Sequence, residues 1–390
     1  MTLSRRKFLI NSTLLGCSAA ASPLFTPLTL AAAPGDNRLV VIILRGAMDG
    51  LDVVRPYGEA DYARYRPSLS RDDGAQDLDG FFALNSRLAP LMPLWQSREL
   101  AFVQAVSTPY RDKRSHFDGQ DLLETGSNSR GGDTTGGKTG WLNRALSLLP
   151  DARMETAYSV GPSRMLLMDG ENDYSAWSPG VDLALSPQTR MLLERIYASD
   201  PLFATSAQMA LEISAKTEMM EGGGRPGSAK GLAKFAADRL NEETRIASFS
   251  INGWDSHNNQ RGTLNRALGE LGEAILALKE GLGPNWQRTT VLAITEFGRT
   301  VAENGTKGTD HGTGGAMVMA GGAINGGQVF GQWPGLGELD LYQNRDLEPT
   351  NDVRRYLGWA LRDLFGMEAS ALGSVVFPGL DMGDNVGIIA

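Results

Sequence analysis

The clearest pattern along the chain is a series of short apolar runs without polar alternation. Such a run is typical of a strand covered on both faces, as in a parallel sheet. Five of these candidate strands are "LVVIIL" (39–44), "LAFVQAV" (100–106), "RIASFSI" (245–251), "TTVLAIT" (289–295) and "AMVMA" (316–320). The pattern therefore predicts an α/β fold built on a mostly parallel sheet flanked by helices.

Helical periodicity appears between the third and fourth runs. Apolar residues recur there at steps of four and three, at Leu264, Leu268, Leu271, Ile275 and Leu278. This spacing predicts a helix that begins after Thr263 as N-cap and stops at Gly281 or Gly283. Strand, helix and strand over residues 245–295 would form a βαβ unit. A second helix is expected after Pro349, capped by Thr350 or Asn351.

The first 33 residues differ from the rest of the chain. Ser4-Arg5-Arg6-Lys7-Phe8-Leu9 precedes an apolar stretch that ends in small residues at Ala31 and Ala33. This order predicts a twin-arginine signal peptide over residues 1–33, with the twin-arginine translocase as export partner. The product would be periplasmic, secreted or at the cell surface. Leu14-Leu15-Gly16-Cys17 leaves a lipid anchor at Cys17 as an alternative.

Composition supports a folded exported region at residues 34–390, which we expect to form a single α/β domain. Hydrophobic residues make up 42% and charged residues 21% of the 390 positions, close to the globular average. Signal removal takes away three positive charges and no acid, so the formal net charge changes from −8 to −11. This charge argues against a nucleic-acid partner. No stretch after the signal offers the ~18 unbroken apolar residues of a membrane span.

Polar residues follow the ends of the apolar runs, where ligands collect in an open parallel sheet. They include all three histidines of the chain. Grouped carboxylates raise one another's pKa and lose hydration, and a divalent cation would relieve both costs. Oxygen and imidazole ligands suit zinc, manganese, magnesium or calcium. The predicted metal ligands are Asp49, His116, Asp255, His257, Glu296, Asp310 and His311.

Hydrolytic chemistry would follow from such a site. A bound metal lowers the pKa of a coordinated water or hydroxyl from ~15.7 towards ~7. Ser115 is the candidate nucleophile, and Arg299 or Arg114 a candidate clamp for an anionic small-molecule substrate. Structural roles are the alternative: His116 could bridge a loop, and Glu296 and Arg299 could form an ion pair.

Six ordered segments resemble the bacterial domain-of-unknown-function family 1501. They are "LVVIILRGAMDGLDVVRPYG", "RSHFDGQDLLETG", "TGWLNRAL", "NGWDSHNNQ", "ITEFGRTVAENGTKGTDHG" and "VFPGL". The resemblance implies an alkaline phosphatase/sulfatase-like fold, with a large α/β sheet that binds one or two metals at its carboxyl edge.

The resemblance also implies roles for individual residues. Asp255, His257 and His311 match the ligands of the first metal in that superfamily. At the second metal site, Glu296-Phe297 stands where an Asp-His pair is usual, and a phenylalanine cannot bind a metal. The second site is therefore altered or lost. The sequence predicts an exported metal-dependent hydrolase of phosphate or sulfate esters, or alternatively a non-catalytic binding or assembly protein that kept the fold.

Overall fold

The apolar run at 39–44 forms the central strand of a large sheet. The computed structural model describes residues 36–71, 74–111, 113–128, 139–179 and 227–390, so the predicted signal peptide lies outside it. Residues Asn37–Ala390 form one compact unit. All five predicted strands are present. In order across the sheet, the strands are β11 (Val329–Phe330), β5 (Leu100–Ser107), β10 (Gly315–Ala320), β9 (Thr289–Ile294), β1 (Arg38–Arg45), β8 (Ile246–Asn252), β6 (Ala157–Val160) and β7 (Ser175–Trp177), and β14 (Asn351–Asp352) also pairs with β5.

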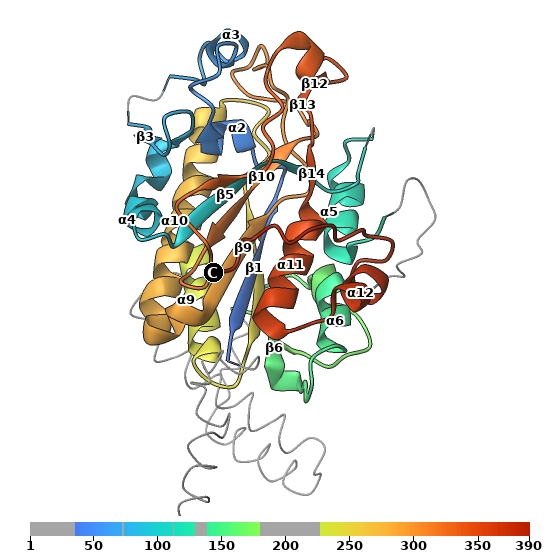
Figure 1. Ribbon diagram of the computed structural model, residues 1–390. Coiled ribbons are helices and arrows are strands. Elements are labelled where there is room, and N and C mark those ends of the chain that lie inside the picture. Colours follow the sequence, from blue (N-terminus) through green and yellow to red (C-terminus); the bar gives the residue numbers. More distant parts are fainter. Residues whose placement is uncertain (1–35, 72–73, 112, 129–138, 180–226) are drawn as a thin grey trace, which may run out of the picture. The chain divides into compact units, whose positions relative to one another are not determined.

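The sheet is mostly parallel, as predicted, and β10 is the exception. β1 pairs in parallel with β8 and with β9, which lie on its two sides (Figure 1). β10 runs antiparallel to both of its neighbours, β9 and β5. Because β10 is reversed, its first residue lies at the edge where β1, β8 and β9 end. Residues just before β10 therefore reach the same edge as residues just after the parallel strands.

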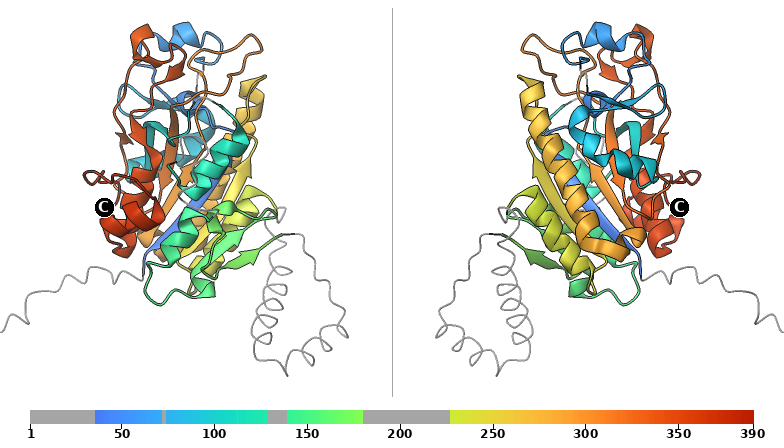
Figure 2. Two further views of the ribbon diagram at one scale, coloured as in Figure 1. Left: turned by 90° about the vertical axis from the view of Figure 1, so that its right-hand side faces the viewer. Right: turned by 90° about the vertical axis from the view of Figure 1, so that its left-hand side faces the viewer.

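Helices cover both faces of the sheet because β1 is apolar on both. Val40, Ile42 and Leu44 pack into one core, while Leu39, Val41 and Ile43 pack into the other. Figure 2 shows the two helical layers from opposite sides. The first core contains α4 (Met92–Gln96), α9 (Ala229–Leu240) and α10 (Gln260–Leu282), and the second contains α5 (His116–Thr125), α6 (Trp141–Leu146) and α11 (Val353–Phe365).

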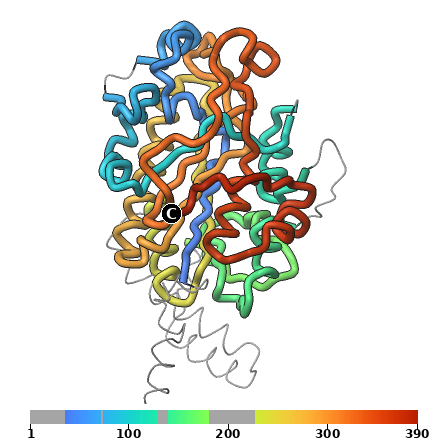
Figure 3. Tube along the Cα trace, viewed as in Figure 1, coloured from blue at the N-terminus to red at the C-terminus, as the bar shows by residue number. Residues whose placement is uncertain are grey.

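Shorter elements join these layers, and Figure 3 follows the chain through them. Two small sheets are β2-β4-β3 (Val54–Arg55, Ala83–Leu84, Gln76–Asp77) and β12-β13 (Leu341–Tyr342, Asp346–Leu347). Short helices are α2 (Gly50–Val53), α3 (Tyr62–Tyr65) and α12 (Ala369–Ala371). Segments of 3₁₀ helix are η2 (Ser86–Leu91), η3 (Met154–Thr156), η4 (Leu166–Met168), η5 (Gly283–Arg288) and η6 (Glu338–Asp340), and η7 (Leu372–Val376) is a π-helix. The described part of the chain contains no helix with the length and apolar character that a membrane span requires.

The predicted start of the long helix was wrong by one turn. α10 begins at Gln260, and its N-cap is Asn259 rather than Thr263. Asn259 has a φ of +45° and no side-chain cap hydrogen bond. The backbone amides of Asn259 and Gln260 instead donate to carbonyls of the loop after β9, at Thr306 and Lys307. A distant segment therefore satisfies two amides at the start of the helix that have no partner within it.

The other helix boundaries are close to prediction. Gly283 is the C-cap of α10, as one of the two predicted stops. The helix after Pro349 is capped by Asp352, not by Thr350 or Asn351, because Asn351 and Asp352 extend the sheet as β14.

Candidate metal centre

Three chain segments bring all three histidines to one place at the edge of the sheet. His116 begins α5, Asp255 and His257 follow β8, and His311 lies just before β10. The ring centroid of His311 lies 4.2 Å from that of His116 and 4.6 Å from that of His257. The reversed direction of β10 is what delivers His311 to this edge.

Asp255, His257 and His311 place three ligand atoms in a small triangle. The Nε2 atoms of the two histidines are 2.9 Å apart. Oδ1 of Asp255 lies 3.1 Å from Nε2 of His257 and 3.5 Å from Nε2 of His311. Ligands at zinc distances of about 2.0–2.1 Å, placed tetrahedrally, would be separated by ~3.3–3.4 Å. The triangle therefore fits three ligands of one small divalent ion.

Hydrogen bonds fix which nitrogen of each imidazole faces the triangle. Nδ1 of His257 lies 2.9 Å from Oδ1 of Asp310, and Nδ1 of His311 lies 2.7 Å from the carbonyl oxygen of Arg114. A carbonyl and an ionised carboxylate only accept, so each Nδ1 carries the proton. In the neutral rings both Nε2 lone pairs then face Asp255. Carboxylate-to-histidine contacts of this kind orient metal ligands.

His116 is turned towards the same carboxylate in the same way. Its Nδ1 lies 2.8 Å from Oε1 of Glu296, while its Nε2 lies 3.6 Å from Oδ2 of Asp255. This Nε2 atom is buried and has no hydrogen-bond partner. Within the described residues, ligand atoms of His116, Asp255 and His311 all lie within 4.8 Å of one another. His116 is therefore a fourth candidate ligand, on the opposite oxygen of Asp255.

Charge around the triangle favours a negative Asp255 and neutral imidazole at His311. Burial opposes ionisation of Asp255, but the hydrogen bond and charge of Arg299 outweigh it and lower the pKa of this carboxyl. Burial lowers the pKa of the His311 imidazole. At His116, the hydrogen bond to Glu296 raises the imidazole pKa against partial burial. A deprotonated His311 beside a carboxylate is the state that binds a metal.

Glu296 and Asp310, two of the predicted ligands, lie behind the imidazoles. Glu296 is fully buried and accepts from the amide of Gly46 and from Gln120 as well as contacting His116. Burial opposes its ionisation, but these hydrogen bonds lower the pKa of its carboxyl. For Asp310, the hydrogen bond to His257 is the main cause of a lowered pKa. Both carboxylates orient histidines in this arrangement.

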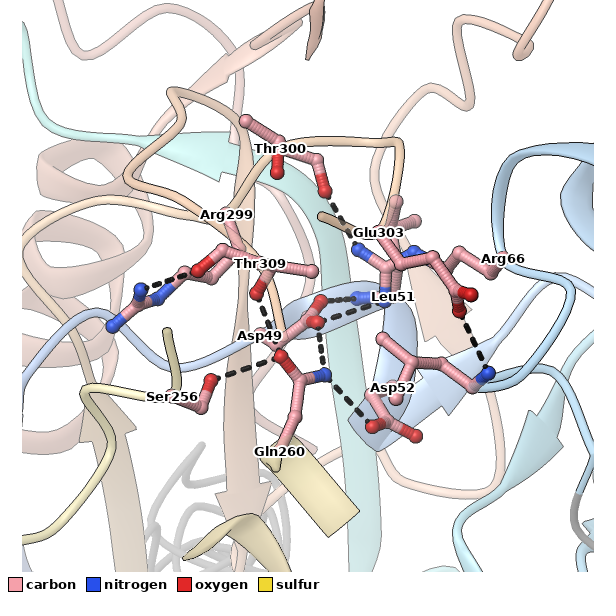
Figure 4. A network of polar contacts seen from close by, with 12 residues as sticks. Asp49, Leu51, Asp52, Arg66, Ser256, Gln260, Arg299, Thr300, Glu303 and Thr309 are labelled. Atoms are coloured by element: carbon pink, nitrogen blue, oxygen red, sulfur yellow. Dashed lines mark hydrogen bonds and ion pairs between the residues drawn. The ribbon is translucent and has the colours of Figure 1, made fainter. Parts of the chain in front are cut away.

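Asp49, also a predicted ligand, belongs to a separate buried network (Figure 4). Its Oδ2 accepts from Nη1 of Arg66 at 2.7 Å and from Nε2 of Gln260 at 2.6 Å. Its Oδ1 accepts from the backbone amide of Leu51 as the N-cap of α2. The structure thus commits both oxygens of Asp49 to other partners, and they do not join the histidine cluster.

Arg299 has a different place from the predicted anion clamp. Its side chain is buried, and it donates to the backbone carbonyls of Gly46, Ala47, Trp254 and Thr309 and to Oδ1 of Asp255. The guanidinium is buried among four carbonyls and one carboxylate, so it is not presented to a substrate anion on the solvent side. Arg299 instead ties the ends of β1 and β8 to the loop after β9. Arg114, the other candidate clamp, donates to Asp346 at 3.1 Å.

Ser115, the candidate nucleophile, is the N-cap of α5. Its hydroxyl oxygen accepts from the amide of Asp118 over a long 3.5 Å contact. Its backbone amide donates to the Tyr110 hydroxyl at 2.8 Å. Ser115 therefore adjoins His116 along the chain, and no contact between its hydroxyl and the ligand triangle is found among the described residues.

Phe297 and Gly46 support the cluster and were missed by sequence reasoning as site residues. Phe297 is buried, and its ring stacks on His116 at 5.3 Å and lies 5.3 Å from His311. Gly46 has a φ of +119°, and a Cβ there would lie 2.6 Å from the backbone nitrogen of Asp255. A Gly directly after a buried strand is the only sequence signal for this close approach.

The triangle is open to solvent on one side. The side chains of Asp255 and His257 are 49% and 44% exposed, whereas that of His311 is 19% exposed. Three protein ligands with a fourth coordination position open to solvent are typical of a catalytic zinc site. Structural zinc sites have four protein ligands and no open position.

Comparison with known families places the chain. A family model described as a protein of unknown function (DUF1501) matches residues 104–372. The chain belongs to this family. The match includes every member of the histidine cluster and excludes β1 and Asp49. No curated protein matches the sequence.

Three solved structures are similar to this member of the DUF1501 family. The lipoteichoic acid synthase LtaP from Listeria monocytogenes has 10% identity and a TM-score of 0.42, over 91% of this chain and 77% of that one. A protein in the alkaline phosphatase superfamily from Vibrio parahaemolyticus has 13% identity and a TM-score of 0.38, over 90% and 71%. The C-terminal periplasmic domain of EcEptC from Escherichia coli, in complex with Zn, has 9% identity and a TM-score of 0.41, over 90% and 92%.

Proposed function

We propose that this chain is a metal-dependent hydrolase of phosphate or sulfate esters. One observation carries the proposal: two imidazole lone pairs and a carboxylate oxygen converge within 3.5 Å of one another on the solvent-exposed side of the sheet edge. Phosphate and sulfate esters are the substrates implied by the resemblance to the alkaline phosphatase group. The substrate would be an anionic small molecule.

Asp255, His257 and His311 would hold one divalent ion, with His116 available on the other oxygen of Asp255. When bound, the ion would polarise an ester oxygen and lower the pKa of a coordinated water or hydroxyl. The chain's own groups set the geometry. Asp310 and the Arg114 carbonyl orient two imidazoles, and Glu296 orients the third.

Two residues are assigned roles at the reacting centre. Ser115 stands at the start of α5, one residue before His116, and would supply the attacking hydroxyl. Arg299 is a positioning residue, because it holds Asp255 through its guanidinium and does not reach the solvent side. It keeps the Asp255 carboxylate ionised and aimed at the histidines.

Metal analysis tests the binding half of this proposal. Exported wild-type protein should carry about one divalent ion per chain, measured by plasma mass spectrometry. His257→Ala combined with His311→Ala should remove it, because the loss leaves Asp255 with at most one imidazole beside it. Asn258→Ala is the matched control, since Asn258 is exposed on the same loop. Folded wild type that takes up no ion from zinc, manganese, magnesium or calcium solutions would overturn the proposal.

A panel of aryl phosphates and sulfates tests the chemistry. Metal-loaded wild type should release the phenol, and removal of the ion by a chelator should abolish release. Ser115→Ala should lower kcat if the serine hydroxyl attacks. An unchanged kcat in that variant removes Ser115 from the mechanism and assigns the attack to water.

The second candidate is a non-catalytic binding or assembly protein with one bound ion. The positions of the two arginines favour it, because Arg299 is buried among backbone carbonyls and Arg114 is paired with Asp346. A folded, metal-loaded protein without turnover on any ester of the panel would select this candidate.

Export is part of the same proposal. The pattern Ser4-Arg5-Arg6-Lys7-Phe8-Leu9 supports passage through the twin-arginine translocase to the periplasm or cell surface. Replacing both Arg5 and Arg6 by lysine should leave the protein in the cytoplasmic fraction. A double variant that is exported like the wild type would refute this route.

A further inference from the structure

Gln260, the first residue of α10, lies between the two segments that carry the metal ligands. Its side chain is completely buried. Its amide oxygen accepts from the hydroxyl of Ser256 at 2.9 Å and from the hydroxyl of Thr309 at 2.6 Å. Ser256 is the residue between Asp255 and His257, and Thr309 directly precedes Asp310 and His311. One amide oxygen therefore contacts both ligand-bearing segments (Figure 4).

The opposite side of the amide fixes its orientation. Nε2 of Gln260 donates to Oδ2 of Asp49 at 2.6 Å and to Oδ2 of Asp52 at 2.9 Å. The same oxygen of Asp49 also accepts from Nη1 of the buried Arg66 at 2.7 Å. The alternative amide orientation would set the oxygen of Gln260 against this carboxylate. The acidic pair therefore turns the amide oxygen towards Ser256 and Thr309.

Arg66 anchors this arrangement to the rest of the loop after β9. Its side chain is fully buried, and it donates to the carbonyls of Val301 and Thr300, both at 2.8 Å. The two ligand segments also touch directly, because the amide of Thr309 donates to the carbonyl of Ser256 at 3.1 Å. The two ligand segments are thus already in contact with each other. The side chain of Gln260 connects both of them to the carboxylates of Asp49 and Asp52.

We propose that Gln260 is a positioning residue that sets the separation of the Asp255-His257 segment from the Asp310-His311 segment. The proposal rests on the proposed metal function, since its consequence is the spacing of the metal ligands. It also gives Asp49 and Asp52 a role apart from metal binding. Asp49 orients the amide of Gln260 and is not itself a metal ligand. Loss of a group that hydrogen-bonds directly to a metal ligand weakens metal binding about 10–100-fold. Gln260 acts one contact further out, through Ser256 and Thr309, so the lower end of this range applies.

The test compares zinc binding and imidazole NMR signals in two variants. Gln260→Met keeps the length of the side chain and removes all four hydrogen bonds. Asn85→Ala is the matched control: Asn85 is also buried and donates to Asp52, and within the described residues it contacts neither ligand segment. The chain has only three histidines, so their ¹⁵N signals are few enough to assign.

We expect Gln260→Met to bind zinc about 10-fold more weakly and to shift the His257 and His311 signals of the metal-free protein. Asn85→Ala should lower stability and change neither. If Gln260→Met does not fold, Ser256→Ala and Thr309→Val remove one arm each and should each show a smaller effect in the same direction.

The readouts separate this proposal from the proposed function. If wild type binds no zinc, the proposed function fails, and the imidazole signals of the metal-free variants alone decide the role of Gln260. Wild-type zinc affinity and unshifted imidazole signals in folded Gln260→Met, or in both single-arm variants, would overturn the positioning role. Equal effects in Asn85→Ala would also overturn it, because they would reduce Gln260 to a general stabilising contact.

Discussion

The Nε2 atoms of His257 and His311 face each other across 2.9 Å. The Nδ1–H group of each ring donates a hydrogen bond, from His257 to Asp310 and from His311 to the carbonyl of Arg114. The Nε2 lone pairs therefore point at one another and at Asp255. A proton shared between the rings or a bound cation would relieve this contact. Burial lowers the pKa of the His311 imidazole, which supports the proposed metal ion over a proton on that ring.

Asp310→Asn tests the orientation of His257. The change removes the negative charge that the Nδ1 proton of His257 faces, so we expect zinc affinity to fall about 10-fold. Stability should change by less than about 0.5 kcal/mol, because the carboxylate is half exposed. Titration calorimetry and thermal melting measure the two quantities. Asp118→Asn is the control, since Asp118 and Asp310 are both 50% exposed. Equal zinc affinities for the two variants would contradict the role of Asp310.

Phe297→Leu tests the apolar wall behind His116 and His311. The smaller side chain leaves space beside both rings, so zinc affinity should fall together with a loss of about 1–2 kcal/mol of stability. Phe365→Leu is the matched control, because Phe365 is also buried, in α11 within the second core. It should lose similar stability in urea unfolding and keep wild-type zinc affinity. If both variants bind zinc alike, the stacking of Phe297 does not serve the site.

Gly46→Ala tests the close approach of β1 to Asp255. Both the positive φ and the 2.6 Å clash with a backbone atom oppose a side chain, so we expect a loss of about 3 kcal/mol or more. Gly253→Ala separates the two causes, because Gly253 has a φ of +97° and open space around its missing Cβ. It should lose about 1 kcal/mol from backbone strain alone. Similar urea midpoints for the two variants would show that the close approach costs little.

Glu99 gives the fold a pH dependence away from the site. Burial opposes its ionisation, but the ion pair with Lys279 and the hydrogen bond from Trp286 outweigh it and lower the pKa of the carboxyl below 4.5. A depressed folded-state pKa stabilises the protein above pH 4.5, and this contribution is lost as the pH falls through the lower value. Glu99→Gln should therefore cost about 1 kcal/mol at pH 7 and little at pH 3.

Chemical unfolding at several pH values measures this difference. Glu270→Gln is the control, because Glu270 makes an exposed pair with Arg266 on the same helix, α10. Its effect should be small at every pH. A Glu99→Gln deficit that stays constant down to pH 3 would mean that the ion pair is not its source.

The strands could be predicted because the runs are mostly apolar on both faces, with only isolated polar residues such as Gln104 and Ser248. The direction of β10 could not, since a buried strand has the same composition whether it runs parallel or antiparallel. The start of α10 was misplaced because its capping partners, Thr306 and Lys307, come from a loop more than forty residues along the chain. Sequence patterns describe local preferences, and this boundary is set by tertiary contacts.

Part of the site could be predicted from the sequence, and part could not. The order of strands and the family resemblance together select Asp255, His257 and His311, and the structure brings these side chains together. The places of Asp49 and Arg299 could not be predicted, because residue type does not reveal which way a buried charge points. Asp49 is drawn to Arg66 and Gln260, and Arg299 to backbone carbonyls. Gln260 lies inside the quoted motif "NGWDSHNNQ", but its role depends on where the loop after β9 returns.

The ligand atoms come from segments that meet only when β8, β9 and β10 are all in place. His257 and His311 are 54 residues apart, and His116 and Glu296 are 180 apart. Such long-range contacts form late along a folding route, because closing a long loop costs entropy before the contact rewards it. An ion bound to these ligands would lower the rate of unfolding and leave the rate of refolding almost unchanged. Removing the ion with a chelator should therefore shorten the lifetime of the folded protein in denaturant, so the ion would stabilise the fold kinetically.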